Sequence, residues 1–229
     1  EFEQGRPVIE AVKKDYPHTF IILSFFSPSG YEIRKNYALA DAVVYLPSDT
    51  LSNAHDFLDI IEPQLVIFVK YEYWFHFTNV LKSNNIPILS ISSIFRKKQL
   101  FFKPYGGFYR KILKTFSYFF VQNDESVRLL RSIGIQQCML AGDTRFDRVF
   151  QIVKNGEELP IVRNFKNQQK TMVVGSCWPE DLDVLAPFIN QNTMKFILAP
   201  HEISEHFITS VESMLEVQSV RYSAAQGKA

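Results

Sequence analysis

Small polar residues follow an apolar run near the start of the chain. Residues 20–32 read FIILSFFSPSGYE, so the run breaks at Ser27, Ser29 and Gly30 and leads into a charged segment. This order predicts a strand, a tight loop and a helix start. Such a loop lies at the carboxyl end of a strand, where helix N–H groups can receive an anion. The alternative is an ordinary strand-to-helix turn, which every parallel sheet contains.

A carboxylate follows a second apolar run. Residues 65–69 read LVIFV, which is typical of a parallel strand buried on both faces, and Glu72 comes shortly after them. At the carboxyl end of a strand, Glu72 could orient a hydroxyl group or act as a base. It could equally be an acid in a first helical turn, where the helix dipole favours negative charge.

Cations and aromatic rings gather in the middle of the chain, where residues 73–123 contain no Asp or Glu. We call residues 96–114 the basic–aromatic surface. Its cations are Arg96, Lys97, Lys98, Lys103, Arg110, Lys111 and Lys114. Such a mixture suits an anionic membrane or a phosphorylated amphiphile. A nucleic-acid groove and a solvated helix face are the alternatives. The net charge of +1 argues against a dedicated nucleic-acid partner, and we predict none.

Three further motifs follow predicted strands. In GDTRFD, Arg145 could hold a phosphate or a carboxylate, or could pair with Asp143 or Asp147. In GSCWPE, the Ser176 hydroxyl and nearby backbone N–H groups could seat a phosphate. In APHE, His201 ends the next predicted strand and would face the same cleft as Ser176.

We predict neither a metal site nor a cofactor. Asp181 and Asp183 form an Asp-x-Asp pattern, but they fall in a predicted first helical turn, where acids are expected anyway. Cys138 and Cys177 lie in different predicted domains, which suits reduced thiols. Dinucleotide, P-loop and nucleophile-elbow motifs are absent from the sequence. No apolar run reaches the roughly 18 residues of a membrane span.

The elements that must position these residues alternate regularly. The first part predicts strands at 18–26, 42–46, 65–69, 86–94, 118–121 and 138–141, and helices at 1–14, 31–39, 51–61, 73–81, 108–116 and 125–132. The last part predicts strands at 172–174, 195–199 and 220–222, and helices at 182–190 and 203–216. This alternation predicts α/β architecture with doubly wound parallel sheets.

The regular alternation of predicted strands and helices is interrupted between the two series of elements. We therefore predict an N-terminal Rossmann-like domain at 1–145, a linker at 146–169 and a second domain that begins at 170–229. The second series is short for a complete α/β domain, so we expect it to be truncated. The absence of an initiator Met also leads us to expect an excerpt of a longer protein.

Seven motifs, taken together and in order, resemble the 3-deoxy-D-manno-octulosonic acid (Kdo) transferase family. They are Glu1-Phe2, SPSGYE, YLPSD, YEYW, GDTRFD, GSCWPE and APHE. The resemblance implies a GT-B fold of two Rossmann-like domains. It also implies transfer of Kdo from CMP-Kdo to a lipid A precursor in lipopolysaccharide biosynthesis, at the cytoplasmic face of the bacterial inner membrane.

The resemblance also implies roles for individual residues. Glu1 matches the Glu of a Ser-x-Gly-Glu-Phe motif and would be the catalytic base. Glu72 matches a Glu of Glu-x-Glu-Leu-Trp-Pro and would bind acceptor, although Tyr73 and Phe75 replace the usual Leu and Pro. We assign the same acceptor side to Ser27, Ser29, Gly30 and Arg96.

On the donor side we assign Arg145, Ser176 and His201. Arg145 stands where the family commonly has Lys in Asn-x-Lys-Phe-Asp, and His201 stands where many members have Arg. Arg and Lys are not equivalent as phosphate ligands, because only the guanidinium offers a planar fork.

Our first hypothesis is therefore a metal-independent, inverting Kdo transferase. The alternatives are another nucleotide-sugar GT-B glycosyltransferase or a sugar-nucleotide epimerase. A non-enzymatic alternative is an anionic-lipid-binding module that uses the basic–aromatic surface.

Overall fold

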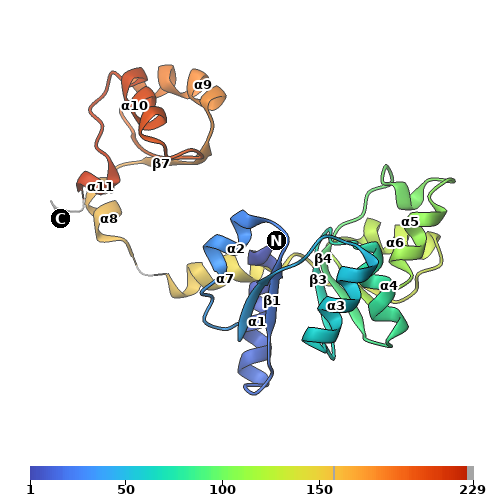
Figure 1. Cartoon of the computed structure of the whole chain (residues 1–229). Coiled ribbons are helices and arrows are strands. Elements are labelled where there is room, and N and C mark those ends of the chain that lie inside the picture. Colours follow the sequence, from blue (N-terminus) through green and yellow to red (C-terminus); the bar gives the residue numbers. More distant parts are fainter. Residues whose placement is uncertain (157, 226–229) are drawn as a thin grey trace. The chain divides into compact units, whose positions relative to one another are not determined.

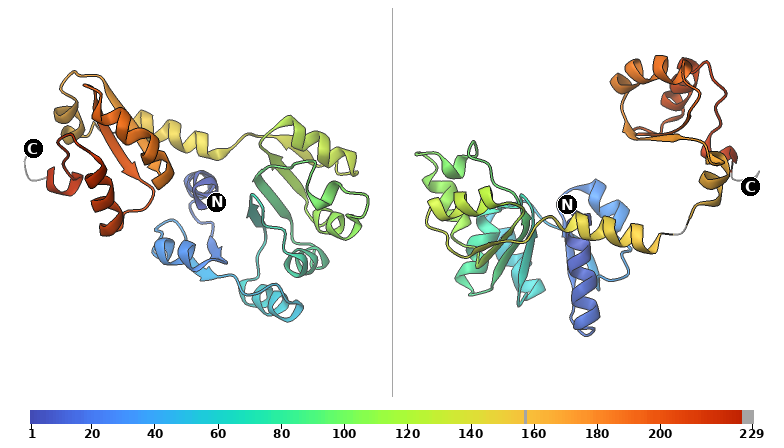
Figure 2. Two further views of the ribbon diagram at one scale, coloured as in Figure 1. Left: turned by 90° about the horizontal axis from the view of Figure 1, so that it is seen from above. Right: turned by 180° about the vertical axis from the view of Figure 1, so that it is seen from behind.

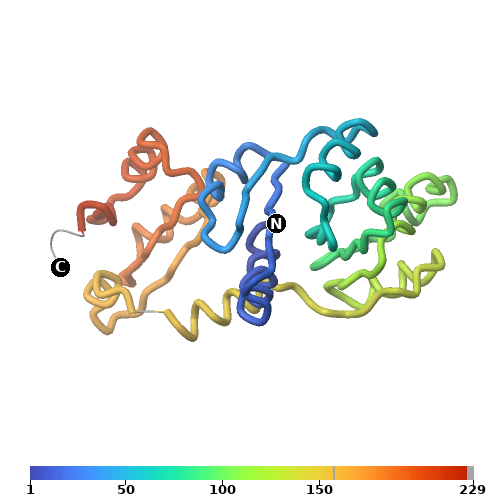
Figure 3. The backbone as a smooth tube through the Cα atoms, turned by 60° about the horizontal axis from the view of Figure 1, so that its bottom comes forward, coloured from blue at the N-terminus to red at the C-terminus, as the bar shows by residue number. Residues whose placement is uncertain are grey.

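The computed structural model describes residues 1–156 and 158–225. The chain forms two compact units, Glu1–Asn155 and Gly156–Ala229. Figure 1 labels their elements and Figure 3 follows the backbone through both. Each unit is described by itself below.

The first unit alternates strands and helices. Its strands are β1 (Ile22–Phe25), β2 (Ala42–Tyr45), β3 (Val66–Val69), β4 (Ile88–Ser93), β5 (Tyr118–Val121) and β6 (Cys138–Leu140). Its helices are α1 (Phe2–Asp15), α2 (Pro28–Arg34), α3 (Leu51–Ile61), α4 (Phe75–Ser83), the 3-10 turn η1 (Leu100–Phe102), α5 (Gly107–Leu113), α6 (Asp124–Ser132) and α7 (Thr144–Asn155).

All strand pairs of this unit are parallel, which confirms the predicted α/β architecture. β1 pairs with β2, and a second sheet has the order β3-β4-β5-β6 (Figure 2). Within the described residues β3 is thus an edge strand, and Leu65 and Ile67 are 48% and 36% exposed. The expectation that residues 65–69 are buried on both faces is therefore wrong for this structure.

The core of the first unit surrounds β4 and β5. Phe95, Leu113 and Phe119 are fully buried there, together with Ile88 and Leu130. Each large apolar side chain buried in this way contributes about 1.5–3 kcal/mol relative to an exposed one. This packed core consequently fixes the positions of the carboxyl ends of these strands.

The stretch predicted as a linker carries two helices. α7 extends the first unit to Asn155 and packs against α1, and α8 (Pro160–Lys166) follows in the second unit. The structure therefore departs from the expected domain end at 145. The segment TRFDRVFQIVKN has apolar residues at helical spacing, which is the pattern of an amphipathic helix. The polar, loop-like residues that follow it led to the prediction of a linker instead.

The second unit contains β7 (Thr171–Cys177) and β8 (Lys195–Pro200), which pair in parallel, with α9 (Pro179–Asn190), α10 (Glu205–Met214) and α11 (Tyr222–Ala225). Its small core consists of Cys177, Leu182, Phe207 and Val211. The strand predicted at 220–222 is wrong, because α11 begins at Tyr222.

Candidate active site

Glu1 and Glu72 form a carboxyl pair. Glu1 stands at the N-cap position of α1, but its side chain does not cap the helix and stays available. Glu72 follows β3, and its Oε2 accepts a hydrogen bond from the Trp74 indole N–H at 2.5 Å. Burial raises the pKa of Glu72, the indole N–H opposes this, and the nearby Glu1 carboxylate raises it again. The Glu72 carboxyl group therefore holds its proton to a higher pH than an exposed carboxyl group does.

The first turn of α1 is held beside the ends of β1 and β3. The Phe2 ring lies 6.1 Å from Phe25, the last residue of β1. A Cβ atom on Gly5 would approach a methyl group of Val69, the last residue of β3, to 3.2 Å. This contact with α1 leaves room only for a small residue at position 5. Glu1 is thus delivered to the carboxyl edge of the sheet, where α/β sites are built.

The Ser-Pro-Ser-Gly loop lies next to this pair. Ser27 and Ser29 are exposed at the start of α2, and their hydroxyl oxygens are 2.7 Å apart. Gly30 is needed there because a Cβ atom would meet the Phe25 ring at 2.7 Å. The preceding Phe26 packs on Trp74 with ring centroids 4.8 Å apart. The predicted acceptor residues of this loop are therefore brought close to Glu72 by an aromatic contact.

The helix start in this region differs from the prediction. α2 begins at Pro28, three residues before the predicted start at 31, and ends at Arg34. Proline is favoured in the first helical turn, because its missing N–H has no partner there in any helix. The loop is consequently shorter than the sequence pattern suggested.

The basic–aromatic surface contributes rings both to the core and to the exterior. Phe101 and Phe116 are buried, whereas Tyr105 and Phe108 are 74% and 52% exposed. The Arg110 guanidinium donates to the carbonyls of residues 101, 103 and 104 and so fixes the turn between η1 and α5. Arg96, Lys97, Lys98, Lys111 and Lys114 are exposed.

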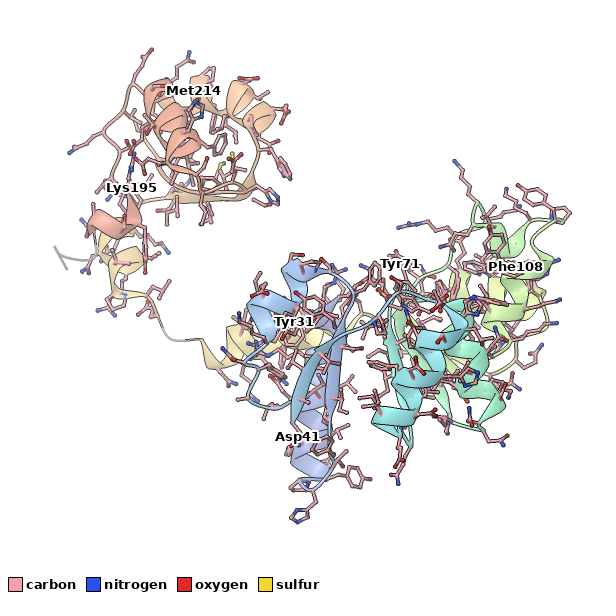
Figure 4. All side chains as sticks on the ribbon, viewed as in Figure 1. Tyr31, Asp41, Tyr71, Phe108, Lys195 and Met214 are labelled. Carbon is pink, nitrogen blue, oxygen red and sulfur yellow. The ribbon has the colours of Figure 1, made fainter. Side chains whose placement is uncertain are left out.

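This surface adjoins the carboxyl pair through one ring contact. Exposed Phe108 packs on Phe75, the residue after Trp74, with centroids 4.9 Å apart. In the view of Figure 4, Tyr71 lies between Tyr31 on α2 and Phe108 on α5. Arg96 lies on the loop after β4, and no hydrogen bond joins its side chain to Glu1 or Glu72 in the described part of the chain.

Arg145 forms an ion pair with Asp143, one of the two partners that the sequence allowed. Its Nη2 and Nε atoms lie 2.6 and 2.9 Å from Oδ2 of Asp143. The Asp143 side chain is only 6% exposed, whereas that of Arg145 is 56% exposed. The guanidinium is therefore anchored along one edge by Asp143 while its remaining donors face solvent.

In the second unit the structure brings Ser176 and His201 together. The Ser176 hydroxyl lies 3.0 Å from Nδ1 of His201, and the imidazole stacks on the Trp178 indole with centroids 3.8 Å apart. The backbone of Ser176 has φ +55°, which costs a non-glycine residue about 1–3 kcal/mol. Asp181 accepts a hydrogen bond from the Trp178 backbone N–H, so it caps α9.

Two structural features bear on the class of protein, namely clusters of metal ligands and helices that could span a membrane. Among residues 1–156 and 158–225, no three His, Cys, Asp or Glu side chains are grouped so as to hold a metal ion. In the same ranges, every helix lacks the length and apolar character needed to cross a bilayer.

Sequence reasoning missed three side chains in these clusters. Trp74 binds Glu72, Trp178 stacks on His201, and buried Gln4 bonds to Asp143. Each lies within three residues of a predicted site residue, so proximity in the sequence was the available signal. Hydrophobic periodicity did not identify them, because it marks the apolar face of an element and not the hydrogen-bonding or stacking partners of a side chain.

The comparison with solved structures defines the architecture of the chain. It is similar to the UDP-GlcNAc 2-epimerase of Neisseria meningitidis bound to UDP-GlcNAc, with a TM-score of 0.65, 14% identity, and coverage of 96% of this chain and 69% of that one. A second similar structure is the S. aureus MnaA–UDP complex, with a TM-score of 0.63, 12% identity, and coverage of 93% and 62%. At this identity the likeness shows the fold, which is of the GT-B type.

The sequence comparisons are more specific. The family model of the 3-deoxy-D-manno-octulosonic-acid transferases matches residues 1–148, and the chain belongs to this family. It is 25% identical to the Kdo transferase of Rickettsia felis over 194 residues, which is 83% of this chain and 41% of that protein. It is 33% identical to the Haemophilus influenzae enzyme over 85 residues, or 36% of this chain and 20% of that one. The chain thus spans about two fifths of the length of the first relatives.

Proposed function

We propose that the full-length protein transfers Kdo from CMP-Kdo to a lipid A precursor, with inversion at the anomeric carbon. Membership of the Kdo transferase family supports the reaction class. The observation that carries the proposal is the pairing of Glu1 with Glu72 at the carboxyl edge of the sheet. An acceptor hydroxyl is a weak nucleophile, so transfer requires a positioned base.

In the proposed step, the acceptor hydroxyl oxygen forms a bond to the anomeric carbon of Kdo. The bond from that carbon to the CMP phosphate oxygen breaks, and CMP leaves as a phosphate monoester. Glu1 takes the hydroxyl proton, and Glu72 holds the acceptor beside it. Ser27, Ser29 and the backbone at Gly30 supply polar groups for the acceptor sugars.

Arg145, Ser176 and His201 are our proposed donor ligands. The free edge of the Arg145 guanidinium suits a phosphate or carboxylate oxygen. In the second unit, the Ser176–His201 pair offers hydrogen-bonding groups for an oxygen atom of the donor.

We further propose that the protein works at the cytoplasmic face of the bacterial inner membrane. The support is the basic–aromatic surface, where exposed cations alternate with the exposed rings of Tyr105 and Phe108. Rings of this kind prefer the lipid headgroup region, and cations are attracted to anionic lipids. Phe75 and Phe108 connect this surface to the carboxyl pair, so a lipid acceptor held there would be close to the base.

The catalytic proposal is tested with Glu1→Gln in the full-length protein. The assay incubates the enzyme with CMP-Kdo and a tetraacylated lipid A precursor, and mass spectrometry detects the glycosylated lipid. We expect transfer to fall about 100-fold or more, since a general base contributes about 10²–10⁴-fold. Glu3→Gln is the matched control, because Glu3 lies in the same turn but pairs with Arg34 at 2.8 Å. Wild-type rates from the Glu1 variant would overturn the base assignment.

A sugar-nucleotide epimerase is the second candidate, because the similar solved structures include UDP-GlcNAc 2-epimerases. The same preparation incubated with UDP-GlcNAc separates the two. Epimerised sugar nucleotide without lipid glycosylation would favour the epimerase.

A further inference from the structure

A buried amide lies one helical turn after Glu1. Gln4 is 1% exposed, and its backbone N–H donates to the Glu1 carbonyl at 2.9 Å. Its side-chain Nε2 donates to Oδ1 of Asp143 at 3.1 Å. A buried amide is costly without partners, so this bond to a distant loop accounts for the presence of a polar residue here.

The same turn is held at a second point. The Thr144 hydroxyl donates to the Gln4 carbonyl at 2.5 Å. Because a hydroxyl has one proton, the 2.9 Å contact between Ser92 and Thr144 must then use the Ser92 proton. The Ser92 carbonyl in turn accepts from the Gln122 side chain at 2.8 Å. The first turn of α1 is thereby tied to α7 and to the end of β4.

Asp143 completes the attachment as a charged acceptor. Burial alone would raise its pKa, but the Arg145 guanidinium, the Arg145 backbone N–H and the Gln4 amide together lower the pKa of Asp143. Both carboxylate oxygens are used: Oδ1 by Gln4 and the Arg145 N–H, and Oδ2 by the guanidinium. The acceptor is therefore fixed in orientation as well as in charge.

We infer that Gln4 is a positioning residue, which fixes the Glu1 carboxylate opposite Glu72 by clamping the first turn of α1 to Asp143 and Thr144. This inference rests on the proposed function, in which Glu1 is the base. Gln4 does not touch substrate and acts through Glu1. A displacement of about 1 Å of a catalytic group lowers the rate about 100-fold, so loss of the clamp reduces turnover more than substrate binding.

The experiment replaces the clamp in the full-length protein. Gln4→Met keeps the length of the side chain and removes its hydrogen bonds, and Thr144→Val removes the second attachment while keeping its shape. We expect kcat for Kdo transfer to fall about 10- to 100-fold in each variant, with KM for both substrates within about twofold. The two variants act at different atoms, so poor folding of one leaves the other informative.

Ser126→Ala is the matched control. Ser126 is also fully buried in the first unit and also joins two elements, since its hydroxyl accepts from the Phe95 N–H at 2.8 Å. It lies on α6 and not on α1. We expect a loss of thermal stability comparable to that of Gln4→Met, with kcat within about twofold of wild type.

Normal kcat in both Gln4→Met and Thr144→Val, with lowered melting temperature, would overturn the positioning role. That result is distinguishable from failure of the proposed function, in which Glu1→Gln itself would remain active.

Discussion

Glu72 lies in an environment that penalises its charge. Burial and the Glu1 carboxylate both favour the protonated form, while Trp74 donates to Oε2 at 2.5 Å. A neutral side chain at position 72 would therefore make the folded state more stable at neutral pH than the Glu72 carboxylate does. Perturbed carboxyl groups of this kind are common at functional sites, which supports the acceptor-side role that we propose for Glu72.

The raised pKa of Glu72 has a consequence for stability. The folded state holds the Glu72 proton more tightly than the unfolded state does. The stability that this proton contributes is therefore lost as the pH rises above the ordinary pKa of a carboxyl group. Glu72→Gln keeps an acceptor for Trp74 and cannot ionise. We expect its melting temperature to equal that of wild type near pH 4 and to exceed it near pH 7, where the wild-type carboxyl group is ionised.

Thermal melts followed by circular dichroism across this pH range provide the measurement. Asp59→Asn, on the exposed face of α3, is the control and should show no such pH-dependent gain. A gain for Glu72→Gln that does not change with pH would contradict the burial argument.

η1 and α5 form the element that presents the basic–aromatic surface. Gly106 is indispensable to its turn, because a Cβ atom there would meet the Leu100 carbonyl oxygen at 1.9 Å. With the turn also bound by Arg110, the cations and rings are displayed on a preformed structure. Such preorganisation would reduce the entropic cost of the membrane binding that we propose.

Vesicle binding tests this element. We expect the full chain to co-sediment with phosphatidylglycerol-containing vesicles and not with pure phosphatidylcholine vesicles. The double change Lys97→Ala and Lys98→Ala should weaken binding by about tenfold or more, at about 1 kcal/mol per cation. Lys166→Ala with Lys170→Ala removes the same charge from the second unit and should have little effect. Binding that ignores anionic lipid would count against the surface.

The chain as a whole consists of two units with separate cores. The larger core lies within residues 54–138, and the smaller one involves Cys177, Leu182, Phe207 and Val211. Units that share no core unfold independently unless a large interface couples them. The position of α7 determines where the first unit ends.

We therefore expect residues 1–155 to fold alone and to melt at the temperature of the first unit in the whole chain. A fragment of residues 1–143 lacks α7 and the Thr144 contact to Gln4, and should melt at a lower temperature. Scanning calorimetry of the three polypeptides measures this. An unfolded 1–155 fragment, or equal stability of the two fragments, would show that the unit is wrongly delimited.

Local sequence patterns determined most of the elements. Apolar periodicity predicted α3 at 51–61 and β5 at 118–121 with the observed bounds, and the ordered motifs identified the family. These features depend on residues that are close together in the chain. α7 was missed because its apolar residues lie between polar, loop-like segments. α11 was missed because the three residues VRY at 220–222 are too few to determine their own conformation.

The tertiary structure alone decided which distant residues meet. Glu1 lies beside Glu72, Gln4 bonds to Asp143, and Ser176 bonds to His201. These pairs depend on strand order and helix packing, which periodicity does not encode, because it reports only which face of an element is apolar. The opening Ser-Pro-Ser-Gly loop was identified from its own residues, whereas its place beside the carboxyl pair follows from the contact of Phe26 with Trp74.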